Sequence, residues 1–130
     1  MKLENAEDRA LVRRGHGTES EVRRTTVDGI VDTGAVTLML PQNVVERLGL
    51  ERQGTAFVTC ADERRDERPL AGPVSVGIGS RTMVTECIVG PPLSEPLIGQ
   101  VVLGRLDLIA DCANQTVTPR HPDYPLFKLK

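Results

Sequence analysis

Apolar residues recur along the chain in short runs separated by turn-forming residues, which is the pattern of a β-rich protein. The alternation is clearest at Val74, Val76 and Ile78, which a strand would place on one face. Asp28-Gly29 is a strong tight-turn pair. Strands at such spacing predict a sandwich or a small closed barrel. The other strand-like runs cover residues 10–14, 21–27, 29–31, 37–40, 55–61, 82–89, 117–119 and 126–129.

Two segments have helical rather than alternating periodicity. Residues 41–48 begin with proline, which suits a first helical turn, and Gly49 ends the pattern. The apolar side chains of this segment fall on one face: Val44, Val45 and Leu48. A second short helix is predicted over 101–108. The fold class predicted is therefore all-β with one or two short helices.

Composition excludes several classes of function. The 130 residues predict one domain over 1–130, with 39% hydrophobic and 26% charged residues as in globular chains. A net charge of -2 and an aromatic content of 2% argue against nucleic acid as a partner. No apolar run reaches the length of a membrane span, so we expect no membrane association.

The cysteines indicate a reducing compartment. The chain has an odd number of widely spaced cysteines, Cys60, Cys87 and Cys112. Residues 1–14 lack the apolar stretch of a signal peptide. We therefore expect reduced, core-packed thiols and a cytoplasmic location. The chain has two histidines and no Cys-x-x-Cys pair, so neither a metal site nor another cofactor is predicted.

The segment that indicates chemistry is Ile30-Val31-Asp32-Thr33-Gly34-Ala35. A carboxylate directly after an apolar strand is partly shielded from water, and Gly34 lets main-chain N–H groups approach it. The Thr33 hydroxyl can form a hydrogen bond across a tight interface. Such a loop can hold two carboxylates together, of which one keeps its proton because both cannot ionise cheaply. The pair can then activate a water molecule and polarise a carbonyl group.

These residues resemble the active-site signature of retropepsin-like aspartic proteases. The resemblance extends over about residues 20–125 and is closest to small stand-alone bacterial-type members. The segment 38–50 resembles the strand and short helix of that family. Glu95-Pro96-Leu97-Ile98-Gly99 resembles its second conserved element, and 106–111 with Pro119 follow.

The resemblance implies a small closed β-barrel of the retropepsin type that acts as a homodimer on peptide or protein substrates. The sequence contains a single D-T-G and no D-S-G, so one chain supplies half of a dyad. Asp32, Thr33 and Gly34 are the implied catalytic residues. A flap is implied over 60–73, and the implied substrate-binding residues are Ala35, Ala61, Asp62, Glu63 and Arg64.

The chain also departs from the family. Relatives tend to carry a glycine near Glu63 at the flap tip. Gln100 and Val36 replace the arginine and the acidic residue of retroviral members, so the ion pair that supports their dimer is missing. Ala35 cannot donate the hydrogen bond that a serine would give the carboxylate. We therefore predict activity at mildly acidic to neutral pH.

Alternative interpretations remain open from the sequence. The chain could be a catalytically silent retropepsin-like module for peptide binding or dimerisation. Asp32-Thr33-Gly34 could form an ordinary turn, since all three residue types favour turns. We interpret His16 and His121 as surface residues. For Asp107 and Asp111 we expect structural or surface roles.

Overall fold

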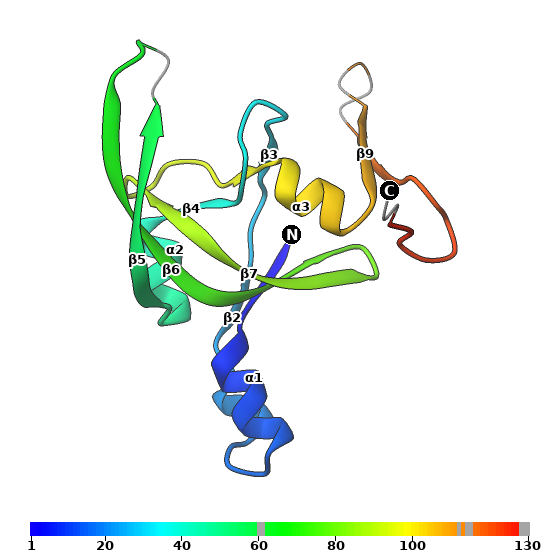
Figure 1. The fold of residues 1–130 in the computed structure, drawn as a ribbon. Coiled ribbons are helices and arrows are strands. Elements are labelled where there is room, and N and C mark those ends of the chain that lie inside the picture. Colours follow the sequence, from blue (N-terminus) through cyan, green and yellow to red (C-terminus); the bar gives the residue numbers. More distant parts are fainter. Residues whose placement is uncertain (60–61, 112, 114–115, 128–130) are drawn as a thin grey trace.

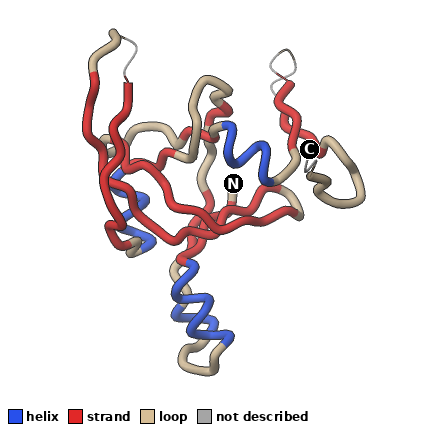
Figure 2. Tube along the Cα trace, viewed as in Figure 1, coloured by secondary structure: helices blue, strands red, loops and turns tan. Residues whose placement is uncertain are grey.

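The computed structural model describes residues 1–59, 62–111, 113 and 116–127, and strands are the most abundant regular structure among them. Figure 2 shows one helix projecting away from the strands, while the others pack beside them. The elements are, in chain order, β1 (Lys2–Asn5), α1 (Ala6–Arg13), the 3-10 helix η1 (Glu19–Glu21), β2 (Arg24–Thr26), β3 (Ile30–Val31), β4 (Met39–Pro41), α2 (Gln42–Leu48), β5 (Glu51–Thr59), β6 (Arg65–Ile78), β7 (Arg81–Gly90), β8 (Leu97–Ile98), α3 (Gln100–Arg105), β9 (Leu108–Asp111) and β10 (Thr116–Pro119).

One eight-stranded sheet forms the body of the protein and curls into a half-barrel (Figure 1). Its order is β2-β1-β6-β7-β4-β8-β3, with β5 paired to β6. Most neighbours are antiparallel, but β3 runs parallel to β8 and β4 parallel to β7. β9 and β10 form a separate two-stranded sheet. The predicted mostly-β fold with short helices is confirmed.

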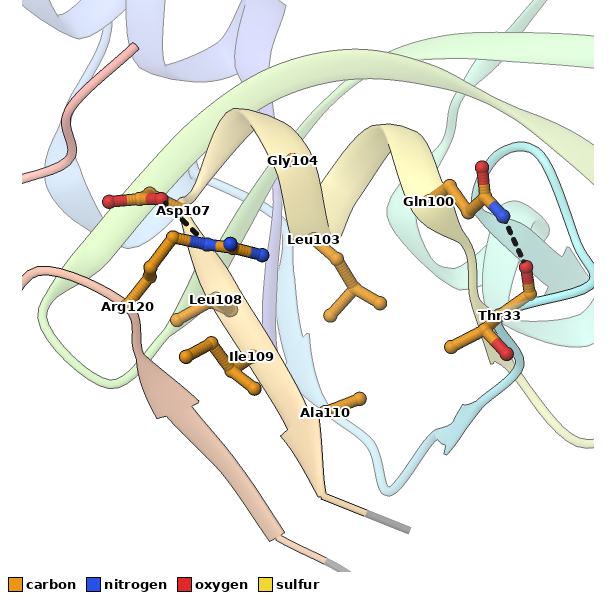
Figure 3. Close-up of a pocket in the computed structure, with 9 residues that line it drawn as sticks. All are labelled: Thr33, Gln100, Leu103, Gly104, Asp107, Leu108, Ile109, Ala110 and Arg120. Atoms are coloured by element: carbon orange, nitrogen blue, oxygen red, sulfur yellow. Dashed lines mark hydrogen bonds and ion pairs between the residues drawn. The ribbon is translucent and has the colours of Figure 1, made fainter. Parts of the chain in front are cut away.

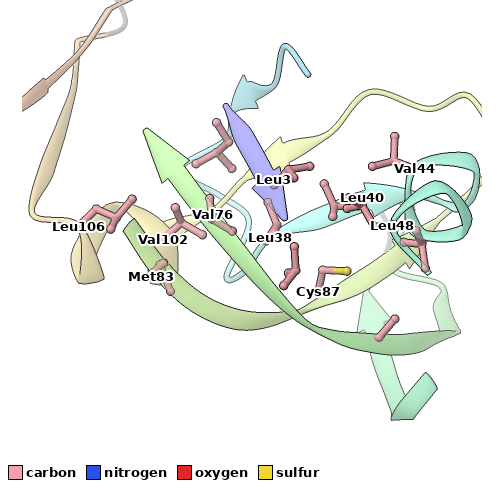
Figure 4. Close-up of a cluster of buried hydrophobic side chains, with 14 of the residues drawn as sticks. Leu3, Leu38, Leu40, Val44, Leu48, Val76, Met83, Cys87, Val102 and Leu106 are labelled. Carbon is pink, nitrogen blue, oxygen red and sulfur yellow. The ribbon is translucent and has the colours of Figure 1, made fainter. Parts of the chain in front are cut away.

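The core lies in the concave side of the curled sheet, beneath α2 and α3 (Figure 4). Alternating residues of β6 point into it, so Val74 and Val76 are fully buried, as the period of two predicted. Cys87 is also fully buried, and burial raises the pKa of its thiol to about 12. This confirms the prediction that it packs as a small apolar residue, whereas Cys60 and Cys112 lie outside the described residues.

The two predicted helices are present, with shifted boundaries. Pro41, expected in the first helical turn, is extended and precedes α2 as its N-cap, and α3 begins at Gln100 rather than Val101. α2 buries Val44, Val45 and Leu48 and ends at Gly49, whose φ of 62° is the left-handed conformation that glycine accommodates. α3 stops at Arg105 instead of Leu108. Asp107, with a φ of 54°, breaks the helix, and Leu108 begins β9.

The prediction of a strand-like run over 10–14 was wrong, because residues 6–13 form α1. The Asn5 side chain caps this helix by accepting from two backbone N–H groups at 2.9 and 3.1 Å. α1 buries no residue and is held largely by ion pairs: Asp8 contacts Arg23 at 2.9 Å, and Arg9 contacts Glu4 at 2.7 Å and Glu19 at 2.5 Å.

Two further predictions need correction. Asp28-Gly29 does not form the predicted tight turn; residues 27–29 connect β2, which pairs with β1, to β3, which pairs with β8. The strand expected over 126–129 is absent from its described part, 126–127, and the rest lies outside the described residues. Within the described ranges, no helix has the length and apolar character needed to cross a membrane.

Candidate active site

Asp32 lies at the start of the loop that follows β3, the short edge strand of the half-barrel. Its backbone N–H donates to the Ile98 carbonyl at 3.0 Å, which continues the parallel pairing of β3 with β8. The side chain is half-buried, and its Oδ1 accepts from the Gly34 N–H at 2.9 Å. A Cβ on Gly34 would lie 3.2 Å from the same Oδ1. The Gly34 N–H therefore approaches and orients the carboxylate, as the sequence predicted, although this hydrogen bond lies at an exposed position.

The segment after β8 fixes the far side of this loop. Gln100 N–H donates to the Ala35 carbonyl at 2.9 Å, and Val101 N–H donates to the Val36 carbonyl at 2.8 Å. Gly99 makes this approach possible, because a Cβ there would lie 2.5 Å from the Thr37 oxygen and 2.8 Å from the Ala35 oxygen. The D-T-G loop and the Leu97–Gly99 element are thus packed backbone against backbone.

The Gln100 side chain adds a contact to the same loop. Its Nε2 donates to the Thr33 carbonyl at 2.5 Å, which Figure 3 shows at one end of α3. The Thr33 side chain is exposed. The sequence analysis noted Gln100 only because retroviral members have an arginine there. Its position directly after Gly99 was the only sequence feature that could have indicated its contact with the Asp32 loop.

The implied flap is a hairpin made by β5 and the first half of β6, paired from Thr59↔Arg65 to Glu51↔Gly72. It is therefore longer than the range 60–73, because β5 contributes its whole length. Asp62, Glu63 and Arg64 form the exposed tip, where Asp62 Oδ1 accepts from the Arg64 N–H at 3.1 Å. Glu63 has a φ of 64°, the left-handed conformation that a glycine would adopt freely. Ala61 lies outside the described residues.

Two cavities lie near the loop that carries Asp32. One of about 340 Å³ is lined by Thr33 of that loop, Gln100 and residues of α3 and β9. The other, of about 500 Å³, lies between β3 and the β9–β10 sheet and is lined by no residue of the loop. Neither is lined by Asp62, Glu63 or Arg64. Figure 1 shows the hairpin and the β3–β4 loop pointing to the same side of the molecule, but these cavities do not join them.

Asp107 closes the far end of the first cavity. Its side chain is 6% exposed and is bonded to the His121 ring, to the Leu126 N–H at 3.1 Å and to Arg120 at 3.5 Å. Burial alone raises the pKa of the Asp107 carboxyl group, but the His121, Leu126 and Arg120 contacts together lower it below its ordinary value. The structural role expected for Asp107 is confirmed, and His121 is its half-exposed partner.

The model of the family described as gag-polyprotein putative aspartyl protease matches residues 18–105 of the chain. The protein therefore belongs to this family of retropepsin-like, aspartic protease-like hydrolases. The matched range begins before β2, ends with α3 and includes the D-T-G loop, the hairpin and the Leu97–Gly99 element.

A solved structure has the same fold. The crystal structure of the retroviral protease-like domain of Ddi1 from Leishmania major superposes with a TM-score of 0.52. The identity is 18%, and the alignment covers 80% of this chain and 86% of the other. No curated protein matches the chain.

Proposed function

We propose that the protein is an aspartic endopeptidase in which Asp32 from each of two chains forms one catalytic dyad. The observation that carries this proposal is the Asp32 carboxylate itself, half-buried and oriented by the Gly34 N–H at 2.9 Å. A binding module has no need of a carboxylate held in this way. Membership of an aspartic protease-like family supports the same conclusion.

The chemistry needs both carboxyl groups. The ionised member of the dyad takes a proton from a water molecule, whose oxygen attacks the carbonyl carbon of the peptide bond. The protonated member donates to the carbonyl oxygen, and a proton then passes to the leaving nitrogen as the C–N bond breaks. Thr33 and Gly34 hold the loop, and Ala35 with the hairpin tip at Asp62–Arg64 would contact the extended substrate.

An apolar rim surrounds the loop and fits contact with a second copy. We define the rim as four exposed side chains next to the loop and α3: Ile30, Val36, Val101 and Ile109. Val36 is 72% exposed although its backbone is bonded to Val101. Burying such side chains against a partner chain is favourable, and the partner would bring the second Asp32.

The proposal is tested by exposing a library of diverse peptides to wild type and Asp32→Asn between pH 4 and pH 7. We expect cleavage by wild type only. Light scattering on Val36→Lys should show a weakened dimer, while Val84→Lys, at another exposed valine on β7, should not. A wild-type dimer that cleaves no peptide would instead favour the silent binding module.

A further inference from the structure

We propose that Gln100 is a positioning residue that holds the Thr33–Gly34 peptide group and, through it, aims a hydrogen bond at the Asp32 carboxylate. The catalytic part of this inference rests on the proposed protease function, whereas the structural part does not.

Two hydrogen bonds involve the opposite sides of a single peptide group. The Thr33 carbonyl accepts from Gln100 Nε2 at 2.5 Å, and the N–H of the same peptide group, at Gly34, donates to Asp32 Oδ1 at 2.9 Å. A trans peptide is planar, with its C=O and N–H pointing in opposite directions. Fixing the carbonyl oxygen therefore fixes the direction of the N–H that the carboxylate receives.

Gln100 is itself carried by a rigid element. It is the first residue of α3, whose Val102 is fully buried in the core, as is Leu106 at the end of the helix. Its own N–H donates to Ala35 at 2.9 Å, so main chain and side chain contact the loop at two places. A side chain anchored on a packed helix positions its partner more accurately than one on a free loop.

The chemical nature of the amide suits this position. A neutral donor orients the peptide group without adding charge beside two carboxyl groups that share a proton. Hydrogen bonds in series also polarise one another, so the bond from Gln100 strengthens the one that Gly34 gives to Asp32. Thr33 and Gly34 are exposed, so replacing this donor by solvent would leave their peptide group free to rotate.

The chain offers a matched control. Gln42 is the first residue of α2 and is likewise exposed, but its Nε2 donates at 2.9 Å to Glu46 within the same helix. Gln42→Leu removes an exposed hydrogen bond from a glutamine Nε2 without touching the Asp32 loop. Gln100→Lys keeps an N–H donor with sufficient reach, and Gln100→Leu removes the donor.

The first measurement is amide hydrogen exchange, which requires no activity. In Gln100→Leu we expect the Gly34 and Ala35 amides to exchange about tenfold faster than in wild type. We expect no change at these amides in Gln42→Leu, and near-wild-type protection in Gln100→Lys. Equal exchange in the two leucine variants would overturn the proposal.

The second measurement is the steady-state kinetics of peptide cleavage. Gln100→Leu should lower kcat about tenfold with KM within about a factor of two, because substrate binding is retained while the carboxylate is misplaced. An unchanged kcat would refute the catalytic part. Wild type without any cleavage would refute the proposed function, while hydrogen exchange would still decide whether Gln100 holds the loop.

Discussion

Gly99→Ala tests whether the close approach of the β8–α3 segment to the Asp32 loop is essential. The new Cβ would lie 2.5 Å from the Thr37 oxygen and 2.8 Å from the Ala35 oxygen, where ordinary contact begins at 3.4 Å. Both atoms belong to backbone, so the loop must retreat by about 0.9 Å. That displacement lengthens the two hydrogen bonds from Gln100 and Val101 to the loop.

The expected loss follows from these contacts. Overpacking costs about 1–3 kcal/mol, and each weakened hydrogen bond costs about 0.5–1.5 kcal/mol. We expect the free energy of unfolding to fall by about 2–6 kcal/mol in urea titrations. Where the variant still folds, cleavage should fall about 100-fold, because a displacement near 1 Å misplaces the carboxylate.

Gly104→Ala, in the helix α3 that follows Gly99, is the matched control. A Cβ at Gly104 would meet nothing within 4 Å, so this change should stabilise the protein by about 0.5–1 kcal/mol through helix propensity. The reasoning is refuted if Gly99→Ala is as stable and as active as Gly104→Ala.

Two other predictions concern the hairpin tip and the N-terminal ion pairs. Glu63→Gly should raise the free energy of unfolding by about 0.5–1 kcal/mol, since the φ of 64° strains any residue with a Cβ; a lower urea midpoint would contradict this. Hydrogen bonds from Arg9 and, to a smaller extent, from Arg24 lower the pKa of Glu19 from 4.5 to about 2. The stability they provide is present above pH 4.5 and is lost as pH falls toward 2, so the urea midpoint should fall over that range. In Glu19→Gln the fall should be smaller, and an identical fall would exclude this cause.

The strands and α2 were predictable because their residues repeat a simple pattern. Val74 and Val76 alternate at the period of a strand, and Val44, Val45 and Leu48 share a helical face. The D-T-G loop was predictable because its short-range geometry depends on adjacent residues, as in the bond from the Gly34 N–H to Asp32.

The remaining features depend on contacts between distant residues. α1 buries none of its residues and is largely held by ion pairs with residues outside the helix, which a hydrophobic pattern does not reveal. Gln100 contacts Thr33 across a separation of 67 residues, which no local pattern encodes. Asp28-Gly29 has the composition of a turn, but pairing of β3 with β8 carries the chain away from β2.

The central claim is that two chains share one dyad, and a mixing experiment tests it most directly. Wild type is equilibrated with increasing amounts of Asp32→Asn at constant total protein, under conditions in which subunits exchange, and peptide cleavage is measured. If each dyad takes one Asp32 from each chain, activity should fall with the square of the wild-type fraction, because mixed dimers are inactive. Activity that falls in direct proportion to the wild-type fraction would mean that each chain acts alone, and the account would be wrong.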